Sequence, residues 1–192
     1  MSTALSSPDD IHGRQLASES GSAWSAGASW DIAGTAAHIR RGFRRVALQF
    51  PDELLGLAPG VMRALEAELR AAATDGEPAA QLFVLADTSF DGYQLDFVAA
   101  QHVAADLLVH YGPADLNAHG PIEARYVFGD EPLDVGGVAA AVAAFFSADQ
   151  PLVVVPALRY AHAASELSSL LAVVAPRAVV AVAEVERRAE GG

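Results

Sequence analysis

Short apolar runs alternate with amphipathic stretches along most of the chain. Runs that are closed by Pro, Asp or Gly predict buried strands. We expect these strands at 45–50, 82–86, 107–111, 125–128, 152–155 and 178–182. Between them, apolar residues recur at the spacing of a helix face. This spacing predicts helices at 31–40, 59–70, 96–105, 135–146 and 161–174.

Alternating strands and helices indicate an α/β fold, and strands that are apolar on both faces indicate a parallel sheet between helices. We therefore expect Rossmann-like α/β layers, with a first domain that is complete and a second that is only begun. The expected division is a disordered tail at 1–28, a first domain at 29–132, a linking helix at 133–149, a partial second unit at 150–183 and a frayed tail at 184–192. The unfinished second unit favours a truncated copy of a longer protein.

Composition excludes several classes of chemistry. All 12 basic residues are Arg, so a Schiff-base lysine and a Walker-A lysine are both absent. The chain has no Cys, and therefore no disulfide and no thiolate ligand. Its net charge of -12 argues against a nucleic-acid partner. With no secretory signal and no membrane-length apolar run, we expect a cytoplasmic protein without a membrane partner.

Polar residues gather where the predicted strands end. In parallel α/β sheets, ligands bind beyond the carboxyl ends of the strands. A candidate strand-end pocket there consists of Asp52, Asp87, Thr88, His110 and Gly112. The alternative interpretation is that Asp52 and Asp87 cap helices and turns.

A zinc site would need a convergent set of ligands. His110, Asp115 and His119 lie close together in the sequence, and with Asp87 they would suit a metal-dependent hydrolase. A histidine at the end of a strand, however, is more often packed in the core. We therefore predict no metal site and no catalytic residue in this chain.

Several ordered motifs resemble one known family. They are WDI at 30–32, RVALQFPDELL at 45–55, ADTSF at 86–90, LDFVAAQHVAAD at 95–106, LVHYGPADL at 108–116 and YVFG at 126–129. Their order and spacing are similar to those of the diphthamide synthase family. Within that family, the wording of the motifs at 87–89 and 112–114 is similar to that of the accessory subunit of the eukaryotic enzyme.

The resemblance implies a function. The family transfers a 3-amino-3-carboxypropyl group from S-adenosylmethionine to a histidine of translation elongation factor 2. It uses a four-iron four-sulfur cluster and a radical mechanism, on a fold of three similar α/β domains. The accessory subunit pairs with the catalytic subunit and helps to keep the catalytic cluster reduced. The implied partners are the catalytic subunit and, indirectly, elongation factor 2.

The cluster ligands of the family are missing from this sequence. The family's Cys pair falls on Tyr93 and Gln94, its loop Cys falls on Asp115, and its last ligand belongs to a third domain. We therefore expect no cofactor on this chain and a non-catalytic role, either as a diverged accessory subunit or as an inactive fragment. A small-molecule-binding α/β domain with an Asp-lined strand-end site remains the alternative.

Overall fold

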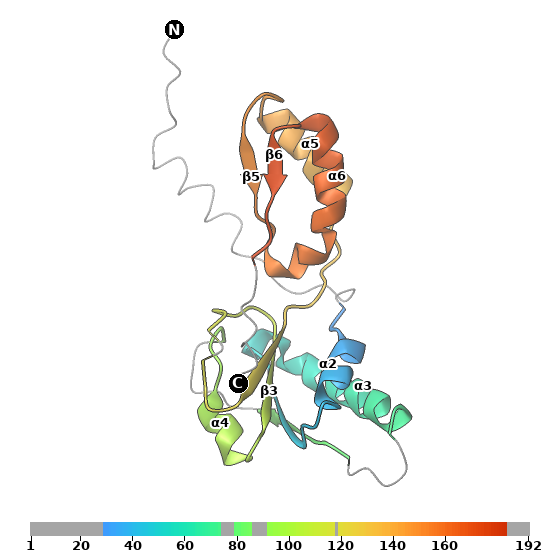
Figure 1. The fold of residues 1–192 in the computed structure, drawn as a ribbon, viewed down its shortest axis with the longest axis vertical. Coiled ribbons are helices and arrows are strands. Elements are labelled where there is room, and N and C mark those ends of the chain that lie inside the picture. Colours follow the sequence, from blue (N-terminus) through green and yellow to red (C-terminus); the bar gives the residue numbers. More distant parts are fainter. Residues whose placement is uncertain (1–28, 74–78, 86–91, 118, 184–192) are drawn as a thin grey trace.

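The computed structural model describes residues 29–73, 79–85, 92–117 and 119–183 (Figure 1). Its first unit is built on a four-stranded sheet with the order β2-β1-β3-β4, in which every pair of neighbours is parallel. The strands are β1 (Arg45–Gln49), β2 (Gln81–Leu85), β3 (Leu107–Tyr111) and β4 (Glu123–Val127). The predicted α/β class with a parallel sheet is confirmed.

Helices cover both faces of this sheet. On one face, α2 (Ile32–Ile39) and α3 (Ala58–Ala71) pack over Val46 and Leu48 of β1. On the other face, α4 (Phe97–His102) packs over Ala47. Figure 1 shows α2 and α3 together on one side of β3 and α4 on the other. This alternation of facing residues along β1 is what the two-residue period of a strand produces.

Burial distinguishes the central strands from the edge strands. Every residue of β3 is buried, whereas β4 has only one buried residue, Val127. The expectation that all strands are covered on both faces therefore fails at the sheet edges, where only one neighbouring strand is present. The edge strand β4 also begins at Glu123, earlier than the apolar run at 125–128 indicated.

Aspartates cap the amino termini of three helices. Asp31, Asp96 and Asp134 each accept a hydrogen bond from a backbone N–H three residues later, with lengths of 2.8–3.1 Å. These bonds satisfy donors that have no partner inside the helix. Asp31 thus caps the first helix, at the start of the range predicted for it.

Two 3-10 helices were not expected from the sequence. After Pro51 ends β1, the chain forms η1 (Asp52–Leu57) and continues directly into α3. Likewise, η2 (Leu158–Ala163) precedes α6 (Ala164–Val174), so this α-helix begins three residues later than the predicted 161. In both cases the spacing of apolar residues did not reveal the 3-10 turn that precedes the α-helix.

The second unit is a parallel pair of strands with two helices. It consists of α5 (Val135–Phe145), β5 (Leu152–Val154), η2, α6 and β6 (Ala178–Val180). Its core includes Ala139 of α5 together with Leu167 and Leu171 of α6. The helix that we expected as a link at 133–149 thus contributes to this core. The Glu131 N–H donates to the Arg159 carbonyl at 2.9 Å and connects η2 to the segment after β4.

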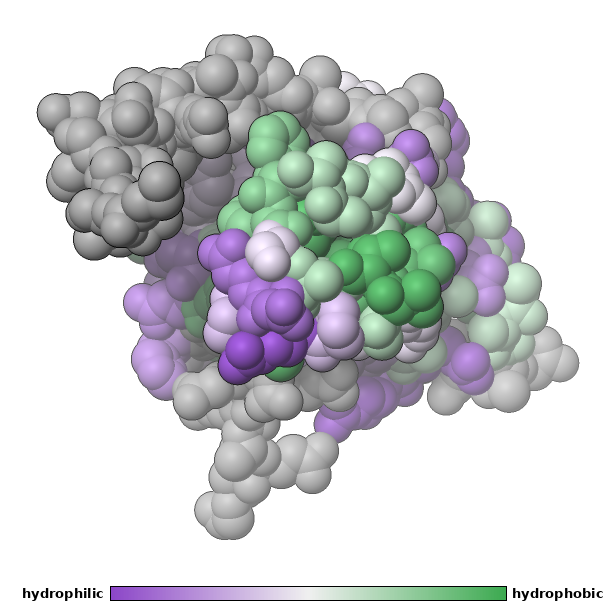
Figure 2. Space-filling model, turned by 90° about the horizontal axis from the view of Figure 1, so that it is seen from above, coloured by the Kyte–Doolittle hydropathy of each residue, from purple (hydrophilic) through white to green (hydrophobic). Residues whose placement is uncertain are grey.

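Much of the second unit's apolar surface is uncovered. Val153 of β5 and Val179 of β6 are 71% and 60% exposed, while the helices cover their neighbours Val154 and Val180. Phe145 and Val173, near the carboxyl ends of α5 and α6, are 77% and 80% exposed. Seen from the end that carries this unit, hydrophobic residues form a broad patch (Figure 2). A patch of this kind is typical of an interaction surface.

Within the described part of the chain, no helix combines the length and the apolar character of a membrane span.

The first unit's stability depends on its central strands. Leu48 is fully buried between β2 and β3, so Leu48→Ala is expected to lower the free energy of unfolding by about 2–5 kcal/mol. Urea unfolding followed by circular dichroism measures this loss. Val98→Ala, at a site that is 53% exposed on α4, is the control and is expected to cost less than about 0.5 kcal/mol. A loss below about 1 kcal/mol for Leu48→Ala would contradict the central position of β1.

Candidate site at the carboxyl edge of the first sheet

The 3-10 helix η1 lies against the carboxyl ends of β1 and β3. Gly112 follows β3 with a φ of +96°, a conformation that favours glycine. A Cβ atom at Gly112 would lie 2.7 Å from Leu54 Cδ1, so η1 lies directly against this glycine. Asp52 begins η1 and its side chain is exposed. The sheet therefore brings Asp52 and Gly112 to the same edge.

Part of the predicted strand-end pocket cannot be assigned to this edge. Asp87 and Thr88 lie outside the described residues, so the complete pocket stays a prediction.

His110 is enclosed in the protein and does not face the edge. Its side chain is 0% exposed, and its Nε2 lies 2.8 Å from the Pro113 carbonyl oxygen, to which it donates. Its ring meets the Tyr126 ring edge-on, at 6.0 Å between centroids. Burial lowers the pKa of the imidazole, and the bond to Pro113 opposes this effect. A neutral His110 thus fastens the turn that follows β3.

Tyr93 and Gln94 lie close to Asp115, although α4 and β3 separate them along the chain. The Asp115 N–H donates to the Tyr93 carbonyl at 3.0 Å, which joins the loop after β3 to the segment before α4. All three side chains are exposed at this edge, and Tyr93 is 51% exposed. The two loops are therefore adjacent, as the resemblance implies for residues that share one site.

Buried Gln49 holds this segment in place, and sequence reasoning missed its role. Gln49 ends β1 and is 1% exposed. Its Nε2 donates to the Gln94 carbonyl at 2.7 Å, and its Oε1 accepts from the Asp96 N–H at 3.0 Å. Asp96 in turn caps α4. The available signal was a polar residue directly after the apolar run Val46 to Leu48, because a buried amide needs partners.

The side chains at this edge do not fit an iron–sulfur cluster. Such clusters are held by Cys thiolates, whereas Tyr93, Gln94 and Asp115 offer a phenol, an amide and a carboxylate. One carboxylate among these groups does not replace a set of thiolates. The two loops are adjacent at this edge, but their side chains lack the chemistry needed to bind a cluster.

A zinc-hydrolase site has no support either. Among the described residues, no three His, Asp or Glu side chains converge as metal ligands would. His110 is enclosed, and Asp87 lies outside the described residues. His119 is exposed in a loop, where its backbone N–H donates to Asn117 Oδ1 at 3.4 Å.

Comparison with known proteins identifies similar sequences. The family model of diphthamide synthesis proteins matches residues 50–190. The chain is 40% identical over 144 residues to 2-(3-amino-3-carboxypropyl)histidine synthase subunit 2 of Gallus gallus, covering 74% of this chain and 28% of that protein. It is 37% identical over 139 residues to the protein of the same name from Danio rerio, covering 72% and 26%. The chain thus matches about a quarter of the length of these relatives.

Solved structures show the same fold. The crystal structure of Dph2 from Pyrococcus horikoshii superposes with a TM-score of 0.60 at 15% identity, covering 78% of this chain and 42% of that one. The structure of Dph2 from the same organism with a 4Fe-4S cluster gives a TM-score of 0.58 at 16% identity, covering 79% and 42%. At these identities the likeness concerns the fold alone.

Loss of the Gln49 amide is expected to loosen this edge. Gln49→Leu leaves the Asp96 N–H and the Gln94 carbonyl without their partner, which costs about 1–3 kcal/mol for each group that stays buried. Urea unfolding and hydrogen exchange at the Asp96 amide measure the effect. Gln101→Leu, on the exposed side of α4, is the control. Equal stability losses for the two variants would show that the amide does not organise the edge.

Anaerobic reconstitution tests the missing ligands. After incubation with ferrous iron and sulfide and removal of free iron, we expect no charge-transfer absorbance near about 400 nm, because the chain offers no thiolate. A ferredoxin treated in the same buffer is the positive control. Stoichiometric iron and sulfide on the desalted chain would contradict this expectation.

Proposed function

Because the chain belongs to the family of diphthamide synthesis proteins, we propose that it is an accessory subunit of a diphthamide synthase that carries no cluster of its own. The assembled enzyme would transfer a 3-amino-3-carboxypropyl group from S-adenosylmethionine to a histidine of elongation factor 2. In this proposal, the catalytic subunit supplies the four-iron four-sulfur cluster and binds S-adenosylmethionine. The present chain acts by binding that subunit in the cytoplasm.

One observation carries this proposal. Two loops are joined at the carboxyl edge, where Gln49 holds Gln94 and Asp96 and where Asp115 meets Tyr93, yet none of the exposed side chains there is a cluster ligand. An ordered edge without cluster ligands is suited to a role that depends on the shape and surface of the protein. A catalytic role would require groups that this edge does not present.

The uncovered apolar surface of the second unit supports a binding role. Parallel strands are normally covered on both faces, whereas Val153 and Val179 stand exposed on the open face of β5 and β6. Burying apolar side chains of this size stabilises an interface, at about 25 cal/mol for each Å² removed from water. A protein partner that covers these strands would therefore gain affinity from them.

The competing function, a small-molecule-binding domain, has less support. Asp130, an acid that follows the carboxyl end of β4, is engaged within the protein. Its backbone pairs with Ser29, and its carboxylate lies 3.5 Å from His162 Nδ1. Asp52 is exposed at the start of a 3-10 helix, where no other described acidic side chain joins it in a metal-binding group.

Light scattering after size-exclusion chromatography tests the subunit role. We expect the isolated chain to self-associate through its apolar surface, and the catalytic subunit of a diphthamide synthase to shift it into a defined heteromeric complex. Val153→Glu is expected to weaken both associations, because it places a charge on the open face of β5. Ser168→Glu, on the exposed side of α6, is the matched control. A sharp monomer peak that does not shift when the catalytic subunit is added would contradict the proposed role.

A further inference from the structure

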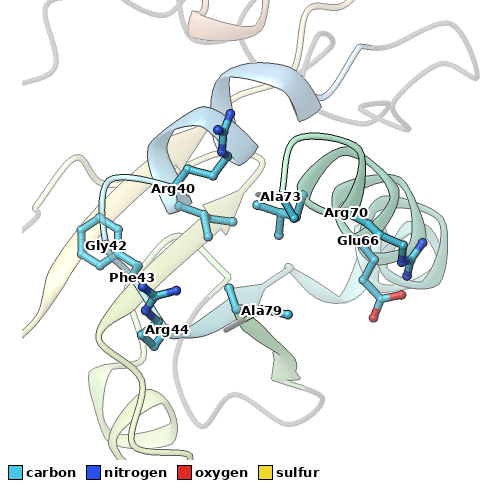
Figure 3. Close-up of a pocket in the computed structure, with 11 residues that line it drawn as sticks. Arg40, Gly42, Phe43, Arg44, Glu66, Arg70, Ala73 and Ala79 are labelled. Carbon is cyan, nitrogen blue, oxygen red and sulfur yellow. The ribbon is translucent and has the colours of Figure 1, made fainter. Parts of the chain in front are cut away.

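A cavity of about 370 Å³ opens at the opposite edge of the first sheet. It lies between the carboxyl-terminal parts of α2 and α3, next to the residues that lead into β1 and β2 (Figure 3). Tyr93 and Asp115, at the carboxyl edge, do not line it. Its volume is within the range of protein sites that enclose a ligand group.

The floor of the cavity is apolar. Ile39 is 1% exposed and belongs to the main core, while Phe43, Leu69 and Ala80 pack against that core and are only partly buried. Ala73 and Ala79 lie between the two banks of the cavity in Figure 3. Small side chains at these positions leave the floor open to an apolar group of a ligand.

The rim of the cavity is basic, in a chain whose net charge is -12. Three arginines and one glutamate line the cavity: Arg40, Arg44, Arg70 and Glu66. Arg40 and Arg70 are exposed, and neither forms an ion pair with another described residue. Each arginine lies at the carboxyl end of a helix, where a positive charge is favourable. That effect explains each charge singly, but it does not explain why the two charges flank an open apolar cavity.

The directions of the two arginine side chains restrict the class of ligand that the cavity can bind. Figure 3 shows Arg40 on the α2 side and Arg70 on the α3 side, with guanidinium groups that point away from each other. Such a pair does not clamp one compact anion. It suits an extended ligand that has an apolar group in the middle and a negative charge on each side. Guanidinium groups pair well with carboxylates in this setting.

We propose that this cavity binds an acidic protein segment, with an aliphatic or aromatic side chain on the floor and carboxylates beside Arg40 and Arg70. A nucleic acid or an anionic membrane is disfavoured because neither places one apolar side chain between two separate carboxylates, which is the arrangement that the floor and the two guanidinium groups suit. The inference does not depend on the subunit role, since the cavity and the carboxyl edge are at opposite ends of the strands. A partner bound at one edge leaves the other open.

Fluorescence anisotropy with a defined peptide tests the proposal on the full chain. The probe is fluorescein-labelled Glu-Asp-Glu-Phe-Leu-Glu-Asp-Glu, for which we expect saturable binding with a Kd below about 1 mM that weakens as salt is added. Two control peptides separate the contributions to binding. One replaces every acid by its amide, and the other replaces Phe-Leu by Ser-Gly. Both are expected to bind at least about threefold more weakly.

Matched variants locate the binding site. Arg40→Gln and Arg70→Gln are each expected to weaken binding of the acidic peptide about threefold, and Ala73→Trp to weaken it by filling the cavity without changing the charge. Arg63→Gln, an exposed arginine of α3 that does not line the cavity, is the control and is expected to leave binding unchanged. Circular dichroism confirms that every variant is folded.

Three outcomes would overturn the proposal. They are no saturable binding of the acidic peptide, equal weakening by Arg63→Gln and Arg70→Gln, and undiminished binding to the Ala73→Trp variant. Tighter binding of a single-stranded oligonucleotide or of phosphatidylserine vesicles than of the peptide would also contradict it. Because none of these assays contains the catalytic subunit, their failure is distinguishable from failure of the subunit role.

Discussion

The carboxyl edge of the first sheet depends on one buried amide. Gln49 follows three buried apolar residues in β1, Val46 to Leu48, and it anchors the segment that precedes α4 to the end of that strand. A buried amide with both of its groups paired is favourable, while the same amide left unpaired would be costly. The arrangement is therefore specific, because only one position of the 94–96 segment satisfies the donor and the acceptor of Gln49 together.

This anchor lets the edge exist without a metal. In many metal-binding proteins the ligand bonds supply part of the folding energy, so that removal of the ligands unfolds the site. Here the loop before α4 is fixed by Gln49 and by the Asp96 cap, and the loop after β3 is tied to it through Asp115 and Tyr93. An edge of this kind loses its ability to bind a cluster when it has no thiolates, but these hydrogen bonds still hold its loops in place.

The sequence predicted the central features of the fold better than its edges. The apolar runs at β1 and β3 marked buried strands because both faces of these strands need apolar residues. The same criterion misplaced the start of β4, where Glu123 can reach solvent at the sheet edge. At the site, the family resemblance marked Tyr93 and Asp115 individually, whereas their adjacency and the role of Gln49 depend on tertiary contacts between residues far apart along the chain. The basic cavity escaped prediction for the same reason, since its two banks come from separate helices.

Association through the exposed valines of the second unit would be sensitive to temperature. Contact through Val153 and Val179 removes apolar surface from water, which carries a negative change in heat capacity. The driving force of such contact is mostly entropic near room temperature and declines on cooling. Complexes that this face holds together would therefore loosen in the cold and tighten toward physiological temperature, the reverse of assemblies that depend on hydrogen bonds. Handling the protein on ice would thus favour its separated form.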